Sequence, residues 1–113
     1  MGKSSLSIRI EPTELAAAVR GRDFVYLVTR GADRSHVVAL KYSVEGSRVT
    51  VRGAGRSSAS NIERASTVTL VWPPATRASE HSDYSIVADG TAMIDEESVV
   101  VDIVTAVFHR PAP

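Results

Sequence analysis

The segment Thr67-Val-Thr-Leu-Val-Trp72 alternates polar and apolar side chains, and it therefore predicts a strand with one buried face. Val68, Leu70 and Trp72 would form that face. The same alternation occurs upstream in Arg48-Val-Thr-Val-Arg52. The chain has 16 valines and only 5 leucines, and this excess of β-branched residues favours strands over helices. Working outward from these two strands, we predict a mainly β protein.

Four more strands are predicted around this pair. The two that precede it are nearly unbroken apolar runs, for which we expect both faces to be covered. A glycine inside the strand that follows Trp72 predicts a β-bulge at Asp89-Gly90. The four segments are Phe24–Arg30, Ser35–Val44, Tyr84–Ile94 and Val99–Phe108. Six short strands separated by turn signals predict a β-barrel or a β-sandwich.

Two short helices accompany the predicted strands. The first, Pro12–Arg20, begins with a proline and is followed by a glycine, as helices often are. The second is Ala59–Ala65, and Ser60 with Glu63 matches a capping box, although Ser57 or Ser58 could equally be the cap. The polar segment 73–82 contains two prolines and predicts a surface loop.

Composition limits the function classes. The 113 residues are enough for a single domain spanning 1–113, and the absence of cysteine excludes disulfides and thiolate chemistry. No apolar stretch approaches the length of a membrane span and no signal peptide is evident, so we expect a soluble, cytoplasmic protein. The isolated His36, His81 and His109 predict no metal site.

Charge is balanced in total, with 13 basic and 13 acidic residues, but it is unevenly distributed. Residues 1–64 carry 11 basic against 6 acidic groups, whereas residues 65–113 carry 2 against 7. The only run of carboxylates, Asp95-Glu-Glu97, falls in a predicted turn, where a solvated role is expected. No residue can be assigned as a catalytic acid, base or nucleophile.

The segment Arg52-Gly-Ala-Gly-Arg-Ser-Ser-Ala-Ser-Asn61 is the candidate binding motif. Glycines let the backbone approach a ligand closely, and arginine and hydroxyl groups can hold phosphate oxygens. A helix that follows would add its free N–H groups and the positive end of its dipole. The alternative is a capped strand-to-helix turn that binds nothing.

These elements in this order resemble the FMN-binding split-barrel proteins of the pyridoxamine 5′-phosphate oxidase-like family, which are related to flavin- and deazaflavin-dependent oxidoreductases. The likeness runs from about Phe24 to Thr91 and includes Tyr84-Ser-Ile-Val-Ala-Asp-Gly-Thr91, which is similar to a family strand ending in a Gly-Thr or Gly-Ala step. The resemblance implies a six-stranded antiparallel split barrel. It also implies a homodimer with cofactor sites between the subunits, FMN or a deazaflavin coenzyme (F-420) as cofactor, and oxidoreduction of a small-molecule substrate.

The resemblance also implies which residues bind the cofactor. The strand His36-Val-Val-Ala-Leu-Lys41 would lie along the ring, and the glycine segment would hold the phosphate. Where the family commonly has Ser-Arg-Lys, this chain has Arg56-Ser57-Ser58, so that Arg56 or Arg52 would supply the cation. Trp72 would stack on the cofactor or, alternatively, fill the barrel. The implied cofactor-binding residues are His36, Val38, Ala39, Leu40, Lys41, Arg52, Gly53, Arg56, Ser57, Ser58, Asn61 and Trp72.

Two other functions are compatible with the sequence. The first is a protein that binds a flavin, a deazaflavin or a tetrapyrrole without turnover, using the same residues. The second is a small nucleic-acid-binding barrel, which would need stacking aromatic residues on a basic face. The chain has 6 aromatic residues, and the two alternating strands, 48–52 and 67–72, contain only one of them, Trp72. We therefore expect no nucleic-acid partner, and we also expect no membrane partner.

Overall fold

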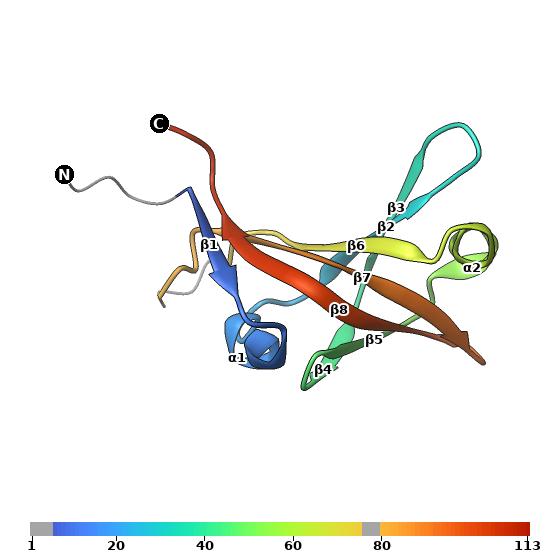
Figure 1. Cartoon of the computed structure of the whole chain (residues 1–113), viewed down its shortest axis with the longest axis horizontal. Coiled ribbons are helices and arrows are strands. Elements are labelled where there is room, and N and C mark those ends of the chain that lie inside the picture. The colour runs from blue at the N-terminus through green and yellow to red at the C-terminus, as the bar shows by residue number, and fades with distance from the viewer. Residues whose placement is uncertain (1–5, 76–79) are drawn as a thin grey trace.

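Eight antiparallel strands form one curled sheet in the computed structural model, which describes residues 6–75 and 80–113. The strand order is β3-β2-β6-β7-β8-β5-β4, and β1 pairs with the last part of β8. Figure 1 shows the sheet wrapping into an open half-barrel, with helix α2 at one end and α1 at the other. The strands are β1 (Ser7–Ile10), β2 (Val25–Arg30), β3 (Ser35–Leu40), β4 (Tyr42–Glu45), β5 (Arg48–Arg52), β6 (Thr67–Trp72), β7 (Ser85–Asp95) and β8 (Ser98–His109).

The prediction of a mainly β barrel is confirmed, but the number of strands was wrong. The predicted strand 35–44 is two strands, β3 and β4, separated by Lys41 alone. These two are the edge strands of the sheet, although they follow one another in the chain. The sheet must therefore curl until its edges approach each other at Lys41. The alternation of inward and outward side chains continues unchanged across Lys41. The sequence therefore gives no sign that the chain pairs with β2 before this residue and with β5 after it.

The second missed strand is β1, whose register aligns Ser7 with His109 and Ile10 with Ala106. It is only four residues long, and Ile10 is its one buried side chain. The partner, β8, is twelve residues long and organises this half of the sheet. It pairs with β7 along its whole length, with β5 near its start and with β1 near its end.

The β-bulge predicted at Gly90 is confirmed as a register shift between Asp89 and Gly90. The extra residue lies on the neighbouring strand: Asp89 pairs with Thr105 and Gly90 with Ile103, which leaves Val104 unpaired. A Cβ atom at Gly90 would lie 2.4 Å from the carbonyl oxygen of Asp102. Glycine is needed here because the backbone of β8 passes too close for any side chain.

The expectation that both faces of the first two predicted strands are covered was wrong for the described chain. In β3, side chains alternate between half-buried and exposed, and Val37 is 52% exposed. In β2, Val25 and Leu27 are fully buried, but Tyr26 lies on the outer face. The apolar residues on that outer face are therefore open to solvent in a single chain.

The interior of the half-barrel is filled by side chains. Leu27, Leu70, Trp72, Ile86 and Val101 are fully buried, and each contributes about 1.5–3 kcal/mol through burial of its apolar surface. The inward alternation predicted for 48–52 and 67–72 is confirmed. No helix within the described residues is long and apolar enough to cross a membrane.

The predicted first helix is a short 3-10 turn, η1 (Pro12–Glu14), followed by a single helical turn, α1 (Leu15–Ala18). Leu15 and Val19 form its buried side, as predicted. In the predicted loop 73–82, residues 76–79 lie outside the described part of the chain.

Arg22 joins the start of β2 to the segment that connects β6 and β7. Its buried guanidinium donates hydrogen bonds to the carbonyl oxygens of Pro73, His81 and Tyr84, at 3.1, 2.9 and 2.6 Å. Burial lowers the pKa of this guanidinium. This arginine, which lies outside the candidate binding motif, therefore fixes the connection between β6 and β7 at one end of the half-barrel.

Candidate cofactor site

Helix α2 (Gly55–Arg64) begins inside the glycine motif, at its second glycine, four residues earlier than predicted. Gly53 and Gly55 have φ angles of 81° and 89°, in the left-handed region that favours glycine. A Cβ at either position would meet nothing within 4 Å, so the backbone here borders open space. No side chain caps the helix, and the predicted capping box is therefore wrong. The first N–H groups of α2 remain available as hydrogen-bond donors.

A shallow pocket of about 370 Å³ opens beside this uncapped end. Arg56 lines it with an exposed guanidinium, the only cation among its lining residues. The opposite wall comes from the end of β7, the start of β8 and the turn between them. The lining residues are Gly53, Ala54, Gly55, Arg56, Ala59, Ile94, Glu96, Glu97 and Ser98.

Two carboxylates therefore face the same pocket as Arg56. Glu96 and Glu97 form the two-residue turn between β7 and β8, since Asp95 pairs with Ser98. Glu96 has a φ of 57°, a conformation that non-glycine residues adopt rarely and at some cost. The sequence predicted a solvated turn at these residues, but it gave no sign that the turn borders the glycine motif.

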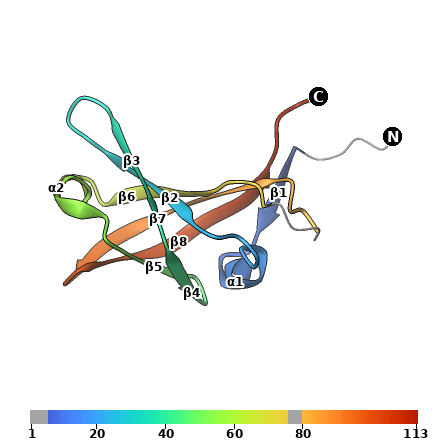
Figure 2. The ribbon, with the colours of Figure 1, turned by 180° about the vertical axis from the view of Figure 1, so that it is seen from behind.

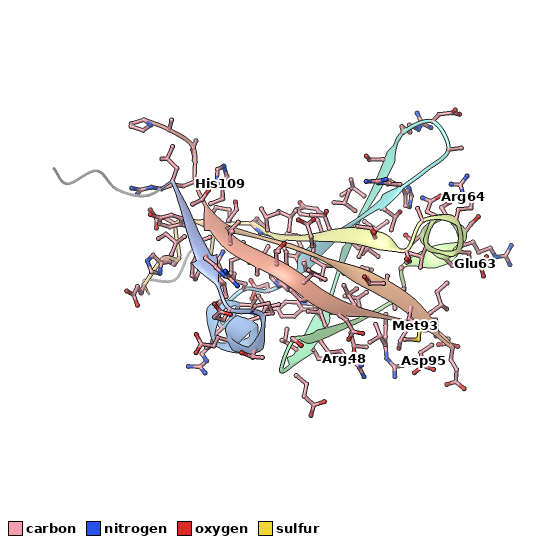
Figure 3. All side chains as sticks on the ribbon, in the orientation of Figure 1. Arg48, Glu63, Arg64, Met93, Asp95 and His109 are labelled. Atoms are coloured by element: carbon pink, nitrogen blue, oxygen red, sulfur yellow. The ribbon has the colours of Figure 1, made fainter. Side chains whose placement is uncertain are left out.

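Of the other predicted phosphate ligands, two point away from this pocket. Ser58 is fully buried on the inner side of α2, and its Oγ has no hydrogen-bond partner among the described residues. Asn61, also buried, donates from Nδ2 to Oγ1 of Thr29 at 3.0 Å and accepts from Arg64 at its Oδ1. These contacts give Asn61 a structural role, joining α2 to β2. Figure 3 shows Arg64 and Glu63 on the outer side of the helix.

Arg52 and Ser57 are exposed but do not line the pocket. Arg52 ends β5 and lies opposite Ser98 in the register of β5 and β8. Ser57 lies in the first turn of α2. Both stand next in sequence to pocket-lining residues, and their part in cofactor binding stays a prediction.

The predicted ring-lining strand, β3, forms one edge of the sheet, and none of its residues lines the pocket. Its side chains divide between two faces: Val38 and Leu40 pack toward the core, whereas Val37 and Ala39 point outward. The half-buried His36 lies opposite Thr29 of β2. The side-chain ammonium of Lys41 donates to the carbonyl oxygen of Asp23 at 3.3 Å.

The free edge of β3 can be assigned from the hydrogen bond in its hairpin. The N–H of Gly31 donates to the carbonyl oxygen of Arg34 at 2.8 Å. Because bonded and non-bonded pairs alternate in an antiparallel ladder, the backbone groups of Val37 and Ala39 face away from β2. These groups form a row of donors and acceptors along an open edge.

Trp72 lies in the core, 0% exposed, with its ring edge-on to Tyr42 at a centroid distance of 5.5 Å. It fills the half-barrel, which was the alternative reading of this residue, and its ring cannot reach a ligand outside. The Tyr42 hydroxyl donates to the carbonyl oxygens of Val19 and Arg22, at 3.1 and 2.5 Å. Burial raises the pKa of Tyr42.

Comparison with known proteins agrees with this architecture. No protein-family model matches the chain. Two uncharacterized proteins, from Mycobacterium tuberculosis and Mycobacterium bovis, are each 31% identical to it over 121 aligned residues, covering 92% of this chain and 82% of theirs. The chain belongs to their family.

Solved structures assign the fold. An FMN-binding domain of a flavin reductase-like enzyme from Shewanella baltica matches with a TM-score of 0.68 and 8% identity, over 91% of this chain and 77% of that one. An FAD-binding protein from Mycobacterium smegmatis matches with a TM-score of 0.59 and 20% identity, over 92% and 99% of the two chains. A candidate pyridoxamine 5′-phosphate oxidase from Listeria innocua matches with a TM-score of 0.61 and 14% identity, over 86% and 96%. The chain therefore has the split-barrel fold that these structures share.

Within this split barrel, the structure places the predicted site residues in two separate regions. Gly53 and Arg56 meet at the pocket beside α2, and β3 presents its open edge elsewhere on the surface. Three lining residues, Ala54, Gly55 and Ala59, fall inside the predicted motif without having been singled out as ligands. The residues that sequence reasoning missed altogether are Ile94, Glu96, Glu97 and Ser98. No cluster of three or more potential metal ligands occurs among residues 6–75 and 80–113.

Proposed function

We propose that this split barrel binds FMN, with the deazaflavin coenzyme F-420 as the alternative, and acts as an oxidoreductase on a small molecule. The observation that carries the proposal is the uncapped start of α2, which opens into a pocket beside Arg56. The names of similar structures support a flavin-type cofactor, since they include FMN-binding, FAD-binding and F-420 reductase proteins.

The residues at the start of α2 fit a phosphate group. The backbone at Gly53 and Gly55 borders open space, so a ligand oxygen can come close to the main chain. The free N–H groups of the first helical turn would donate to that oxygen, and the helix dipole would favour its negative charge. Arg56 would add a charge-assisted hydrogen bond, and Ser57 a hydroxyl donor.

The ring system would lie along β3. The open edge formed by the backbone of Val37 and Ala39 would pair with polar atoms of the ring, while the outward side chains of both residues would contact its apolar part. A bound flavin or deazaflavin would supply the hydride transfer, and the chain would hold and orient it and limit its exposure to water. No acid or base in the chain is needed for a transfer of this kind.

The proposed site lies between two subunits. A row of outward side chains crosses five neighbouring strands in register: Ala39, Tyr26, Val71, Val87 and Val107. Tyr26 is 37% exposed, and the rest of the row is half-buried or exposed. An apolar face of this extent is typical of a protein interface. We propose that a second copy covers it in a symmetric homodimer, so that the cofactor is enclosed by both chains.

Binding without turnover, of a flavin, a deazaflavin or a tetrapyrrole, is the second candidate. It would use the same residues as the oxidoreductase and differ from it only in the absence of turnover. Steady-state reduction of the bound cofactor by NADH or NADPH, compared with the rate in free solution, separates the two functions.

The experiment is a titration of the purified protein with FMN, F-420 and riboflavin, followed by visible absorbance and flavin fluorescence. We expect FMN or F-420 to bind at least about tenfold more tightly than riboflavin, because a charge-assisted hydrogen bond contributes roughly 1.5–3 kcal/mol. The double variant Arg56→Ala/Ser57→Ala should remove that preference and leave the fold intact. Arg20→Ala, which changes an exposed arginine near α1, is the matched control. Equal affinities of the parent protein for riboflavin and FMN would contradict the phosphate site.

A further inference from the structure

Two carboxylates share the proposed phosphate pocket with Arg56. Glu96 and Glu97 line this pocket and are exposed. Within residues 6–75 and 80–113, neither side chain forms an ion pair or a hydrogen bond. Figures 1 and 2 both show the turn that carries them at the same end of the half-barrel as α2. An anion that enters the pocket therefore meets two negative charges as well as the arginine.

The turn itself does not call for a glutamate at position 96. The φ of Glu96 is 57°, and glycine, asparagine or aspartate is the usual residue at a turn position of this kind. A glutamate there costs conformational energy, and no ion pair or hydrogen bond of its side chain offsets that cost within the described part of the chain. Backbone strain of this kind is often found where a side chain serves function rather than folding. The carboxylate of Glu96 is left free to act on the pocket.

The charges around the pocket do not alter its balance. Arg52 of β5 and Asp95 of β7 each pair with Ser98 in the strand register, so these opposite charges lie on either side of one residue and offset each other. Neither of them lines the pocket. Arg30 and Arg34 are exposed on the β2–β3 hairpin, and α2 lies between that hairpin and the acidic turn in both Figure 1 and Figure 2. The charge of the pocket is therefore set by its own lining residues.

These lining residues accept one negative charge on a ligand but oppose a second. The start of a helix is equivalent to about half a positive charge, so α2 and Arg56 together offer about one and a half. Glu96 and Glu97 carry two negative charges. A phosphomonoester has about 1.5–2 negative charges at pH 7, whereas a phosphodiester has one. The N–H groups and the guanidinium can donate to a phosphate of either kind, but the second charge of a monoester meets a lining that is already slightly negative.

We infer that Glu96 and Glu97 determine the specificity of this pocket, which takes a phosphate with a single negative charge, as in a phosphodiester, in preference to a dianionic phosphomonoester. The two glutamates act by repelling the more highly charged ligand, and repulsion of this kind is a common source of specificity. The inference rests on the proposed function, because the pocket is the one assigned to the cofactor phosphate. The proposed function leaves the charge of that phosphate open, and these two residues select it.

Three flavins that differ only at the 5′ end of the ribityl chain test the inference. Riboflavin has no phosphate, riboflavin 5′-(methyl phosphate) has one negative charge, and FMN has nearly two at pH 7.5. Their dissociation constants are measured by flavin fluorescence in 50 mM NaCl, where screening is weak. The parent protein is compared with Glu96→Gln/Glu97→Gln, which removes both charges and keeps the size of the side chains. The matched control, Glu14→Gln/Glu45→Gln, makes the same change in net charge at two exposed glutamates outside the pocket, and circular dichroism confirms that each variant is folded.

We expect the parent protein to bind FMN no more tightly than the methyl diester. In Glu96→Gln/Glu97→Gln, FMN should bind at least about tenfold more tightly than in the parent and overtake the diester, which should gain only about threefold. Riboflavin, which carries no charge, should bind the parent and this variant with the same affinity. In 500 mM NaCl the gain for FMN should shrink, because salt screens the carboxylates. The control should leave all three dissociation constants unchanged.

The inference is overturned if the parent binds FMN at least about threefold more tightly than the diester, or if the ratio of these two dissociation constants is the same in the parent and in Glu96→Gln/Glu97→Gln. An equal change of this ratio in the control would also refute it. Failure of the proposed function gives a different result. If neither FMN nor the diester binds the parent more tightly than riboflavin does, the phosphate site is wrong and the inference fails with it. If both bind more tightly than riboflavin and their ratio ignores the substitution, the inference alone is refuted.

Discussion

Gly90→Ala should be among the most damaging single-methyl additions in this protein. The added Cβ would lie 2.4 Å from the carbonyl oxygen of Asp102 and 2.8 Å from Cγ1 of Val101, and real Cβ contacts essentially never fall below 3.0 Å. The obstructing oxygen belongs to the backbone of β8, so no side-chain rotation can relieve the contact. The two strands must separate at the bulge, where Gly90 pairs with Ile103.

The magnitude follows from comparison with a second glycine. Overpacking a well-filled site costs typically 1–3 kcal/mol, and a backbone contact this short places Gly90→Ala at about 3 kcal/mol or above. At Gly46, with φ of 62°, a Cβ would meet nothing within 4 Å, so Gly46→Ala should cost only the conformational penalty of about 1 kcal/mol. For a domain whose total stability is about 5–15 kcal/mol, the first change should lower Tm by roughly 12–24 °C.

The assay is urea denaturation followed by the fluorescence of Trp72, the only tryptophan of the chain and a fully buried one. Parent protein, Gly90→Ala and Gly46→Ala are compared at equal protein concentration, since dimer formation would add to the apparent stability. If Gly90→Ala lowers the free energy of unfolding no more than Gly46→Ala does, the backbone of β8 can shift at the bulge to accommodate the added methyl group. This outcome would refute the argument that close approach of the backbone fixes this glycine.

Three further predictions concern the buried Ser58 and Asn61 of α2 and the half-buried Tyr42 of β4. Ser58→Ala should leave the free energy of unfolding unchanged or raise it by up to about 1 kcal/mol, because it removes a buried Oγ that has no hydrogen-bond partner among the described residues. A decrease of more than about 1 kcal/mol in urea denaturation would contradict this prediction. Asn61→Ala should lower the free energy of unfolding by about 1–3 kcal/mol and speed hydrogen exchange in the β2–β3 hairpin, because it removes the hydrogen bonds to Thr29 and Arg64. Exchange at the parent rate would contradict the role of Asn61 in joining α2 to β2. Burial raises the pKa of Tyr42 in the folded state. The stability that the neutral hydroxyl contributes is therefore complete below the unfolded pKa of about 10, and it is lost as pH rises through the higher folded pKa. Tyr42→Phe should lessen the fall in the free energy of unfolding measured above pH 10.

Local alternation was enough to place several strands but not to count them. The segments 48–52 and 67–72 form strands with the predicted bounds, because one buried face gives a period of two that few other structures share. The same period runs without interruption from Val38 through Leu40 and Tyr42 to Val44. At Lys41 the chain passes from one edge of the sheet to the other while the inward face stays inward. A change of pairing partner leaves no trace in a single-sequence pattern.

The glycine motif was picked out from the sequence, but the residues that lie beside it in space were not. The glycine motif does border a pocket, because two left-handed glycines before a helix expose backbone N–H groups whatever the rest of the fold does. Treating residues 53–58 as a loop hid a helical period, however, in which Ser58, Asn61 and Ile62 share the buried side of α2. The approach of Glu96 and Glu97 to this motif depends on how β7 and β8 cross the sheet. No local signal encodes a contact between residues about forty positions apart.

The filled interior is what turns the outer surface of this split barrel into its functional surface. Trp72, Leu27 and Leu70 leave no room for a ring system inside, so the proposed cofactor would have to lie on the outside, where a single chain offers a shallow pocket and an open strand edge. The charges on that surface are unbalanced locally, with two carboxylates at the pocket and exposed arginines on the projecting β2–β3 hairpin. A neutral total charge conceals this arrangement. In the proposed dimer, the outer surface that contacts the second copy would also enclose the cofactor, so dimer formation and cofactor binding would depend on the same face of the sheet.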